Sequence, residues 1–431
     1  MHFLFVAQGT SGDINPQLAL AKELHKREHA VSFLTHTYFR ELVQRHGLEF
    51  IDFDDAVHYQ MLQSPDYWHP AKGMRLSARF LTDVIAKQYQ LVCKHYKPGQ
   101  TVAITSVNGF GVRIAHETLG IPMISAHICP WLIRSHRAPC YQPRHNFIRY
   151  LKYEPTGIGN WIYYFLGDLF VVDPLFKSTI NQLRRELGLG PVSRIFQDWM
   201  HSPQRIIGLF PRWYVNPYPS DWPAHVQVTQ FPQEDASTRE EPPESVLRFL
   251  NAGDPPIVFS PGTGMAHVPQ FFATAIDACR KLRRRGLLLT RYREQLPDLL
   301  PEFVHHEPYL PFSQLLPRAA ALVSHGGIGG VAQALAAGIP QLLMPMTMDQ
   351  PDNARRLVAF QVARTIHWRR FDSRDVVKHL EYLLDSPTVH ENCQRFKALF
   401  PKDNPVGESC DLIEEFADKV HRNGLVSEQM K

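Results

Sequence analysis

The chain has few cysteines, and they form no recognisable sequence motif. Its six cysteines are scattered over 431 residues without a Cys-x-x-Cys pair or a zinc-ligand spacing. This pattern excludes a zinc-ribbon type of site and a dense disulfide framework. Reduced thiols in a cytoplasmic compartment fit it best.

A long hydrophobic run is also absent. The longest apolar stretch, residues 161–176, is interrupted by Asp168 and Asp173, so it is too short to span a bilayer. The sequence opens on strand-like residues 2–7, with no basic segment before an apolar core, so a secretory signal is not expected. We therefore expect a cytoplasmic protein that touches a membrane at most peripherally, at the inner membrane face.

Charge of one sign is not in excess. The chain carries 46 Lys and Arg against 42 Asp and Glu, a net charge of +4, which gives no case for nucleic-acid binding. Hydrophobic and charged residues make up 44% and 20% of the chain, as in globular proteins. Its length is enough for two ordinary domains.

Apolar strands alternate with amphipathic helices in both halves of the sequence. Strands are expected at residues 2–7, 30–35, 101–105 and 122–125, and again at 256–260, 287–290, 321–323 and 341–346. Such alternation predicts parallel sheets covered by helices on both faces. The fold class is therefore α/β, with two doubly wound Rossmann-like domains that face each other across a cleft.

A polar, proline-rich stretch at residues 232–243 reads as a linker between the two halves. We expect an N-terminal domain at 1–240, a C-terminal domain at 250–405, and a helix at 406–431 that packs back on the first domain. Residues 55–230 break the regular rhythm and are rich in aromatics. They suit the wall of an apolar pocket, and the candidate residues are Trp68, Trp131 and Tyr163, although most aromatics are simply core.

The most informative stretch is Ser-His-Gly-Gly-Ile-Gly-Gly at residues 324–330, between an apolar strand and a predicted helix at 331–337. Glycines let the backbone come close to a ligand, and the N–H groups at a helix start favour an anion. His325 adds a donor that can become cationic. Tight packing alone would also explain such a turn.

A second polar stretch, Met-Asp-Gln-Pro-Asp-Asn at residues 348–353, follows the next apolar strand. A diphosphate held by the first loop and sugar hydroxyls held by Asp349 and Gln350 would describe a nucleotide-sugar. Thr263, in the Pro-Gly-Thr-Gly loop at 261–264, can supply a further hydroxyl. The alternatives are a helix N-cap at Asp349 and a plain turn at Thr263.

These motifs resemble those of family 1 glycosyltransferases, UDP-glycosyltransferase-like enzymes of the two-Rossmann-domain (GT-B) type. The resemblance is carried by residues 9–16, 308–311, 315–317, 325–327, 349–350 and 353–354. Within the family, residues 193–204 and 209–211 look most like the bacterial rhamnosyltransferases that make mono-rhamnolipids, here called the rhamnolipid branch. Sterol and macrolide glucosyltransferases are more distant relatives.

The resemblance implies an inverting, metal-independent transfer of a hexose from a nucleoside-diphosphate sugar to an acceptor hydroxyl, without a further cofactor. The rhamnolipid branch implies L-rhamnose from dTDP-rhamnose and an apolar lipid acceptor, a hydroxyalkanoyloxyalkanoate. The alternatives are a UDP-glucose- or dTDP-sugar-dependent enzyme for a polyketide, sterol or phenolic acceptor, a sugar-nucleotide epimerase on the same fold, and a degenerate, non-catalytic partner protein.

The resemblance also assigns roles to single residues. Asp13 would be the catalytic base, where many members carry a histidine, although an Asp there can also cap the following helix. His325 and the N–H groups of Gly327, Gly329 and Gly330 would hold the diphosphate, with Gly330 in place of the usual Ser or Thr.

Two further donor-site residues would contact the nucleotide base and the ribose. Tyr309 would stack on the base, and Phe312 replaces the usual Gln. Gln333 stands where plant members grip the ribose hydroxyls with Glu. Both departures favour a dTDP-sugar over a UDP-sugar.

Overall fold

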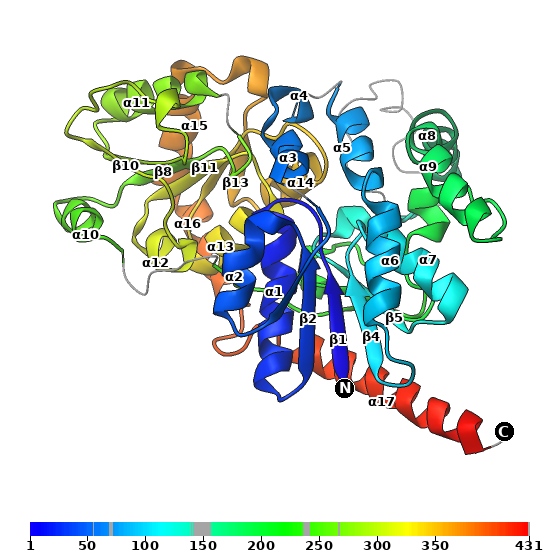
Figure 1. The fold of residues 1–431 in the computed structure, drawn as a ribbon. Coiled ribbons are helices and arrows are strands. Elements are labelled where there is room, and N and C mark those ends of the chain that lie inside the picture. The colour runs from blue at the N-terminus through cyan, green and yellow to red at the C-terminus, as the bar shows by residue number, and fades with distance from the viewer. Residues whose placement is uncertain are drawn as a thin grey trace. The chain divides into compact units, whose positions relative to one another are not determined.

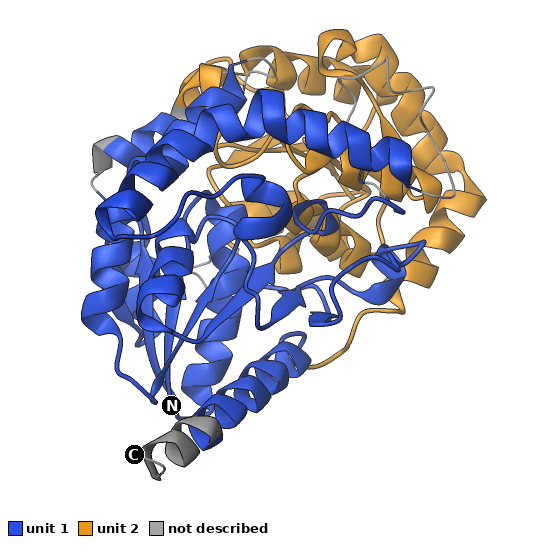
Figure 2. Cartoon of the chain, turned by 90° about the vertical axis from the view of Figure 1, so that its right-hand side faces the viewer, with its two compact units in different colours: residues 1–62, 72–234, 404–431 blue, residues 63–71, 235–403 orange. Residues whose placement is uncertain are grey.

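The computed structural model of the chain describes residues 1–54, 56–68, 72–138, 140, 157–235, 242–265 and 268–429. The chain forms two compact units (Figure 2). Unit 1 comprises Met1–Leu62, Lys72–Glu234 and Asn404–Lys431, and unit 2 comprises Gln63–Ala71 and Asp235–Asp403. The C-terminal segment thus belongs with the N-terminal half, and a short piece of that half belongs with unit 2.

Unit 1 is built on a seven-stranded parallel sheet in the order β3-β2-β1-β4-β5-β6-β7 (Figure 1). Its strands are β1 (His2–Val6), β2 (Ala30–Thr35), β3 (Glu49–Asp52), β4 (Thr101–Thr105), β5 (Met123–His127), β6 (Ile206–Gly208) and β7 (Val226–Val228). Its helices are α1 (Ser11–Lys26), α2 (Arg40–Arg45), α3 (Ala56–Gln60), α5 (Gly73–Thr82), α6 (Ile85–His95), α7 (Phe110–Leu119), α8 (Ile158–Gly167), α9 (Asp173–Glu186) and α17 (Gly407–Gln429).

Unit 2 contains a six-stranded parallel sheet in the order β10-β9-β8-β11-β12-β13. Its strands are β8 (Ile257–Ser260), β9 (Gly286–Leu289), β10 (Val304–Glu307), β11 (Ala321–Ser324), β12 (Gln341–Leu343) and β13 (Ala363–Thr365). Its helices are α4 (Pro65–Trp68), α10 (Glu244–Asn251), α11 (Pro269–Leu282), α12 (Phe312–Leu315), α13 (Ile328–Ala337), α14 (Gln350–Ala359), α15 (Ser373–Asp385) and α16 (Pro387–Lys397).

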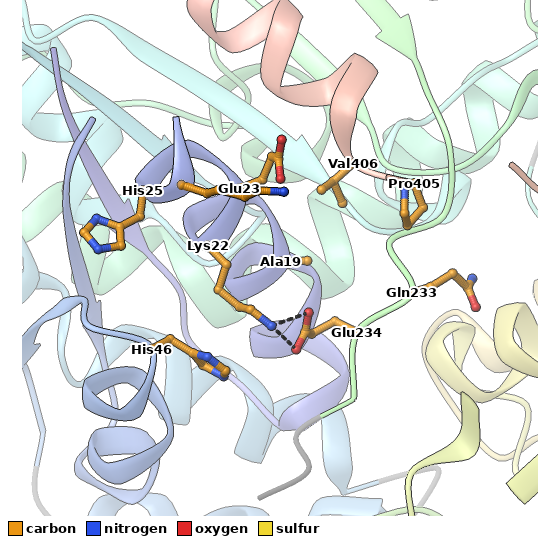
Figure 3. Close-up of a pocket in the computed structure, with 10 residues that line it drawn as sticks. Ala19, Lys22, Glu23, His25, His46, Gln233, Glu234, Pro405 and Val406 are labelled. Atoms are coloured by element: carbon orange, nitrogen blue, oxygen red, sulfur yellow. Dashed lines mark hydrogen bonds and ion pairs between the residues drawn. The ribbon is translucent and has the colours of Figure 1, made fainter. Parts of the chain in front are cut away.

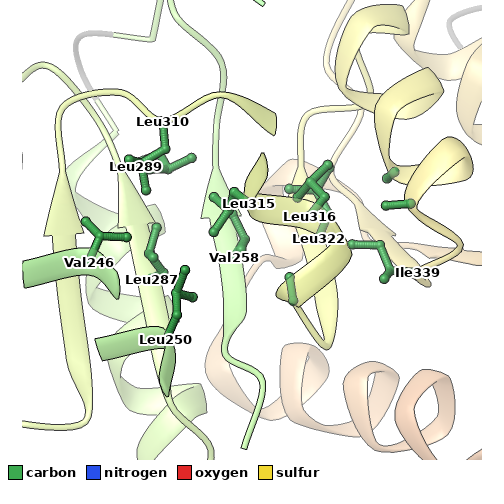
Figure 4. Close-up of a cluster of buried hydrophobic side chains, with 13 residues drawn as sticks. Val246, Leu250, Val258, Leu287, Leu289, Leu310, Leu315, Leu316, Leu322 and Ile339 are labelled. Carbon is green, nitrogen blue, oxygen red and sulfur yellow. The ribbon is translucent and has the colours of Figure 1, made fainter. Parts of the chain in front are cut away.

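Each sheet is buried on both faces, as the continuous apolar strands predict. In unit 2, Val258, Leu287 and Leu322 pack with residues of α10, α12 and α13 in one cluster (Figure 4). Their neighbour Phe259 points to the other face, where it meets Phe271 of α11. The two doubly wound α/β sheets expected from the sequence are therefore confirmed.

Helix α1 begins at Ser11, directly after its N-cap residue Thr10. Thr10 and Asp13 form a capping box at its start, which satisfies N–H groups that would otherwise lack partners. Pro16 then falls within the second turn. Because of the capping box, the loop after β1 is only four residues long.

Helix α17 packs against α1 within unit 1. Arg27 of α1 forms ion pairs with Asp411 (2.7 Å) and Glu414 (2.6 Å), and Thr229 shares a hydrogen bond with Ser409 (2.7 Å). None of the helices in the described ranges combines the length and apolar character needed to cross a bilayer. All six cysteines are free thiols.

Candidate functional site

Each sheet has the strand order of a doubly wound fold, so each has a point where the order reverses. This point lies between β1 and β4 in unit 1 and between β8 and β11 in unit 2. Open α/β sheets bind ligands at the carboxyl ends of strands at such a point. Asp13 lies in the first turn of the helix that follows β1, and the loops after β8 and β11 contain Thr263 and His325.

Asp13 lies in the first turn of α1 with one carboxylate oxygen bonded locally. Its Oδ2 accepts hydrogen bonds from the Thr10 backbone N–H (2.9 Å) and the Thr10 hydroxyl (3.2 Å). Its Oδ1 accepts no hydrogen bond from any residue in the described ranges. Burial raises the pKa of Asp13 to about 6, against the lowering effect of the Thr10 hydrogen bonds. The carboxylate therefore caps its helix and still keeps an oxygen free for a proton.

Gly9 is required where the chain turns towards Asp13. Its φ is +132°, and a Cβ at this position would lie 2.3 Å from Asp13 Oδ2. Its N–H donates to Nε2 of His36 (3.0 Å), a fully buried side chain. The other ring nitrogen of His36 donates to the buried carboxylate of Asp54. His36 is therefore neutral and anchors the loop that carries Asp13.

The same carboxylate is shared with a second histidine. Nδ1 of His58 lies 3.1 Å from Asp54 Oδ2, and its Nε2 lies 3.0 Å from the carbonyl oxygen of Phe80. Both ring nitrogens of His58 therefore lie within hydrogen-bond distance of an acceptor. Burial alone would raise the pKa of Asp54, but the hydrogen bonds from His36 and His58 lower it to about 2.

The ligand atoms of His36, Asp54 and His58 lie within 4.8 Å of one another, as at a metal site. Their hydrogen bonds, however, use every ring nitrogen of the two histidines. The cluster is thus accounted for as a hydrogen-bonded network. Sequence reasoning missed it, because His36 lies 18 residues before Asp54 and no local motif links the three residues.

The loop after β4 also contacts the loop after β1. Asn108 donates to the carbonyl oxygen of Gln8 (2.6 Å), and the Gln8 side chain donates to the carbonyl oxygen of Phe80 (2.8 Å). Residues 106–108 therefore support the backbone before Asp13 and form no hydrogen bond with the Asp13 carboxylate itself.

In unit 2, the imidazole of His325 lies between two glycines. A Cβ at Gly262 would lie 2.8 Å from its Cε1, and one at Gly327 would lie 2.6 Å from its Nε2. Burial lowers the pKa of His325 to about 4, so the ring is neutral at pH 7. Its buried Nδ1 has no hydrogen-bond partner in the described ranges. The cationic form that the sequence suggested would need an anion beside the ring.

The glycine-rich turn becomes the first turn of α13. This helix begins at Ile328, three residues before the predicted start, with Gly327 as its N-cap. Gly329 and Gly330 thus present first-turn N–H groups, which lack intrahelical partners. Gly329 has no atom within 4 Å of a Cβ position, and at Gly330 the nearest atom, on Phe312, is 3.5 Å away. Neither of these two glycines is required by packing.

Asp349 is the N-cap residue of α14, and its Oδ2 accepts from the side chain of Asn353 (2.7 Å). Asn353, fully buried, also donates to the carbonyl oxygen of Gly326 (3.0 Å) and so ties the two polar loops together. The Oε1 of buried Gln350 accepts from the backbone of Met346 (2.9 Å). Met348 has a φ of +57°, an uncommon conformation that often accompanies ligand loops.

The two residues expected at the base and ribose lie on other elements of unit 2. The Nε2 of Gln333 donates to Asp235 (3.0 Å), whose carboxylate also accepts from the backbone of Phe312 and Ser313. The guanidinium of Arg291 lies 5.9 Å from the ring centroid of partly exposed Tyr309. Thr263 is exposed in its loop.

The acceptor candidates lie on separate elements. Trp131 is half-buried in a single helical turn, Pro130–Leu132, just after β5. Tyr163 lies in α8 beside Tyr164, and burial raises its pKa to about 12. Trp68 ends α4 in the segment that belongs with unit 2, and its side chain lies outside the described residues.

Two cavities in unit 1 lie away from these loops. One of about 420 Å³ is lined by the second half of α1, including Lys22, which donates to both oxygens of Glu234 (2.8 and 3.0 Å; Figure 3). Lys22 lies about 14 Å along α1 from Asp13, at about 1.5 Å per residue. A second cavity, of about 850 Å³, opens at the amino ends of β1 and β2. Neither contains a predicted site residue.

Two family models match the chain. Residues 160–413 match the UDP-glucoronosyl and UDP-glucosyl transferase model, and residues 3–136 match the glycosyltransferase family 28 N-terminal domain.

Curated relatives include a sterol 3-beta-glucosyltransferase of Arabidopsis thaliana and the O-mycaminosyltylonolide 6-deoxyallosyltransferase of Streptomyces fradiae, each 26% identical. The first match covers 94% of this chain and 64% of the relative, so the chain spans less than two thirds of that protein. The second covers 97% of this chain and 98% of the relative.

Solved structures share the fold of the whole chain. The kitacinnamycin glycosyltransferase superimposes with a TM-score of 0.71 at 20% identity, covering 96% of this chain and 99% of that one. A Streptomyces sp. SF2575 glycosyltransferase complexed with thymidine diphosphate gives 0.62 at 18% identity, covering 96% and 99%.

Proposed function

The chain belongs to the UDP-glucoronosyl and UDP-glucosyl transferase family, and we propose that it moves a hexose from a dTDP-sugar to a hydroxyl of an apolar acceptor, with inversion and without a metal. It is a glycosyltransferase of the GT-B fold and uses a nucleotide-sugar donor. Because the matched family is one of glycosyltransferases, we set aside the alternatives of a sugar-nucleotide epimerase and a non-catalytic partner protein.

The observation that carries the mechanism is the free Oδ1 of Asp13 at the point where the strand order reverses, on a carboxylate with a pKa of about 6. A base with this pKa is ionised at pH 7 and holds a proton more strongly than an ordinary Asp, with a pKa of about 3.9. The acceptor hydroxyl gives its proton to Asp13 as its oxygen bonds to the anomeric carbon. The nucleoside diphosphate leaves from the opposite face with the bonding electrons.

The geometry at the start of α13 supports its proposed role as the diphosphate site. First-turn N–H groups and a neutral imidazole with one free nitrogen stabilise the negative charge that gathers on a leaving diphosphate. Asp349 caps α14, which follows the neighbouring strand β12, and its carboxylate there suits sugar hydroxyls. Asn353 holds the two loops in a common geometry.

The proposed sugar is L-rhamnose and the proposed acceptor a hydroxyalkanoyloxyalkanoate lipid, on the resemblance of residues 193–204 to the rhamnolipid branch. The second candidate is a polyketide or sterol acceptor. It is favoured by the likeness to the Streptomyces fradiae O-mycaminosyltylonolide 6-deoxyallosyltransferase over 97% of this chain and to the Arabidopsis sterol 3-beta-glucosyltransferase. Assays with dTDP-rhamnose should therefore offer a hydroxy-fatty acid ester, a macrolide and a sterol in parallel.

The donor is tested by thermal unfolding with dTDP, UDP or GDP. A nucleotide at about 100 times its Kd adds about 2.7 kcal/mol of stability. We expect dTDP to stabilise the chain most. Stabilisation by UDP alone would contradict the dTDP proposal, and no response to any of the three would contradict the site.

The base is tested by Asp13→Asn. Asparagine keeps an oxygen that accepts from the Thr10 N–H but cannot take a proton, so the transfer rate should fall by about 10² to 10⁴ while the fold persists. Asp298→Asn, at an exposed carboxylate of unit 2, is the matched control. Undiminished transfer by Asp13→Asn would leave Asp13 a cap only.

A further inference from the structure

One segment of unit 1 exposes an unusual amount of apolar surface. Of the fifteen large hydrophobic side chains that are exposed in the described ranges, eight lie within residues 158–171. They are Ile158, Trp161, Ile162, Phe165, Leu166, Leu169, Phe170 and Val171, with exposures from 38% to 70%. Single exposed hydrophobics are ordinary, but a contiguous patch marks an interaction surface.

The backbone brings these side chains to one side. Positions 158, 161, 162, 165 and 166 follow the spacing of a helix face in α8, and the rings of Trp161 and Phe165 stack with centroids 5.3 Å apart. The inner side of α8 holds Tyr164, which is 3% exposed. A π-helical turn, Asp168–Val172, then extends the outer apolar surface towards α9.

The acidic groups of this segment point inward. Asp168 is 1% exposed and pairs with Arg134 (2.6 Å), while buried Asp173 accepts from the backbone N–H groups of Arg194 (2.9 Å) and Ile195 (3.1 Å). The outer surface from residue 158 to residue 176 therefore carries no charge. A helix face that is merely solvated would be polar.

Two exposed cations lie on other helices of unit 1, one in the helix that follows the patch and one in a helix packed against that helix. Lys177 is exposed in α9, and Arg75 is exposed in α5, which packs against α9 (Figure 1). Neither forms an ion pair with another described residue, whereas the nearby Arg79 pairs with Asp83 (3.3 Å). An apolar face with Trp and Phe, beside unpaired cations, is complementary to an anionic lipid surface. A two-fold contact between copies would instead gather the unpaired cations of both copies in one interface.

We propose that the outer face of residues 158–171, with Lys177 and Arg75 beside it, docks the protein on an anionic bilayer. The helix then lies in the headgroup region with its aromatic side chains at the acyl boundary. Docking does not depend on the transfer chemistry or on the donor. It brings the enzyme to a surface where an apolar acceptor is concentrated.

The test uses the full chain with vesicles of phosphatidylcholine containing about 30% phosphatidylglycerol, and with pure phosphatidylcholine. Sedimentation should show binding to the anionic vesicles that weakens as the salt concentration rises. Phe170→Asp changes the most exposed residue of the patch. It should weaken binding at least about tenfold, because it removes an aromatic side chain that docking would bury in the bilayer. Leu299→Asp, at an exposed leucine of unit 2, is the matched control and should bind like the wild type.

Thermal unfolding and dTDP binding of Phe170→Asp should match the wild type, which separates docking from the donor site. Lys177→Glu should weaken binding to the anionic vesicles and leave the weaker binding to neutral vesicles unchanged. Failure of the wild type to bind anionic vesicles overturns the proposal. So does a wild-type dimer that Phe170→Asp converts to a monomer without any change in vesicle binding, because a second copy would then cover the surface.

Discussion

The carboxylate of Asp13 caps its helix and is also the proposed proton acceptor, and each of these uses needs a carboxylate oxygen. Oδ2 completes the capping box with Thr10, and Oδ1 stays open. Its pKa is raised to about 6 by burial, since two hydrogen bonds from Thr10 do not offset the loss of solvent. Protonation at Oδ1 would leave the hydrogen bonds of Oδ2 with Thr10 unchanged. Asp13 could therefore accept a proton and still cap its helix.

A stability measurement can test the raised pKa of Asp13. A carboxyl group with a folded-state pKa of about 6 and an unfolded pKa of 3.8 favours folding when protonated, and this contribution is lost as the pH rises through 6. Asp13→Asn should therefore raise the unfolding midpoint more at pH 7.5 than at pH 4. An equal effect at both pH values would contradict the raised pKa.

The buried network behind Gly9 can be tested in the same unit. His36→Leu removes the acceptor of the Gly9 N–H and one donor to Asp54, so it should cost about 3 to 5 kcal/mol of stability in urea unfolding. Adding Asp54→Asn to this variant should cost less than the sum of the two single changes, because the pair acts as a unit. Additive costs would mean that the two groups act independently.

At the level of elements, the start of α13 is built from glycines that packing does not demand. A Cβ at Gly329 would meet no atom within 4 Å, and the residue has an ordinary negative φ. A glycine in a helix costs about 1 kcal/mol relative to alanine. Its presence in the first turn is therefore better explained by a ligand that comes close to the backbone.

Gly329→Ala separates these two effects. We expect the free chain to gain up to about 1 kcal/mol in thermal unfolding, while the affinity for dTDP falls because the methyl group stands where a phosphate approaches. Gly167→Ala is the matched control, because Gly167 ends α8 in unit 1 and its Cβ position also meets no atom within 4 Å. A gain in stability with unchanged dTDP affinity in Gly329→Ala would place the nucleotide elsewhere.

At the level of the whole molecule, the proposed donor residues all belong to unit 2 and the proposed base to unit 1. A nucleoside diphosphate without its sugar should therefore protect unit 2 from amide hydrogen exchange, at residues 261–264, 325–330 and 346–353. Residues 9–16, which include the start of α1, should exchange as in the free chain. Protection confined to unit 1 would contradict the assignment of the nucleotide site to unit 2.

Much of this organisation was readable from the chain alone. The strands at 30–35 and 101–105 were predicted to the residue, because buried parallel strands are short continuous apolar runs. The glycine-rich turn and Asp349 were predicted because their spacing relative to the strands is local. The strands β6 and β7, of three residues each, were missed, since so short a run carries no periodic signal.

Local sequence thus determined the two sheets, the place of their ligand loops and the residue types that the loops offer. The tertiary structure alone decided which distant groups meet: His36 and Asp54 behind Gly9, Asn353 between two loops, and Asp235 on Gln333. It also turned Asp168 and Asp173 inward and left an apolar face outside. Hydrogen bonds and burial depend on separation in space, and spacing along the chain specifies that separation only within one element.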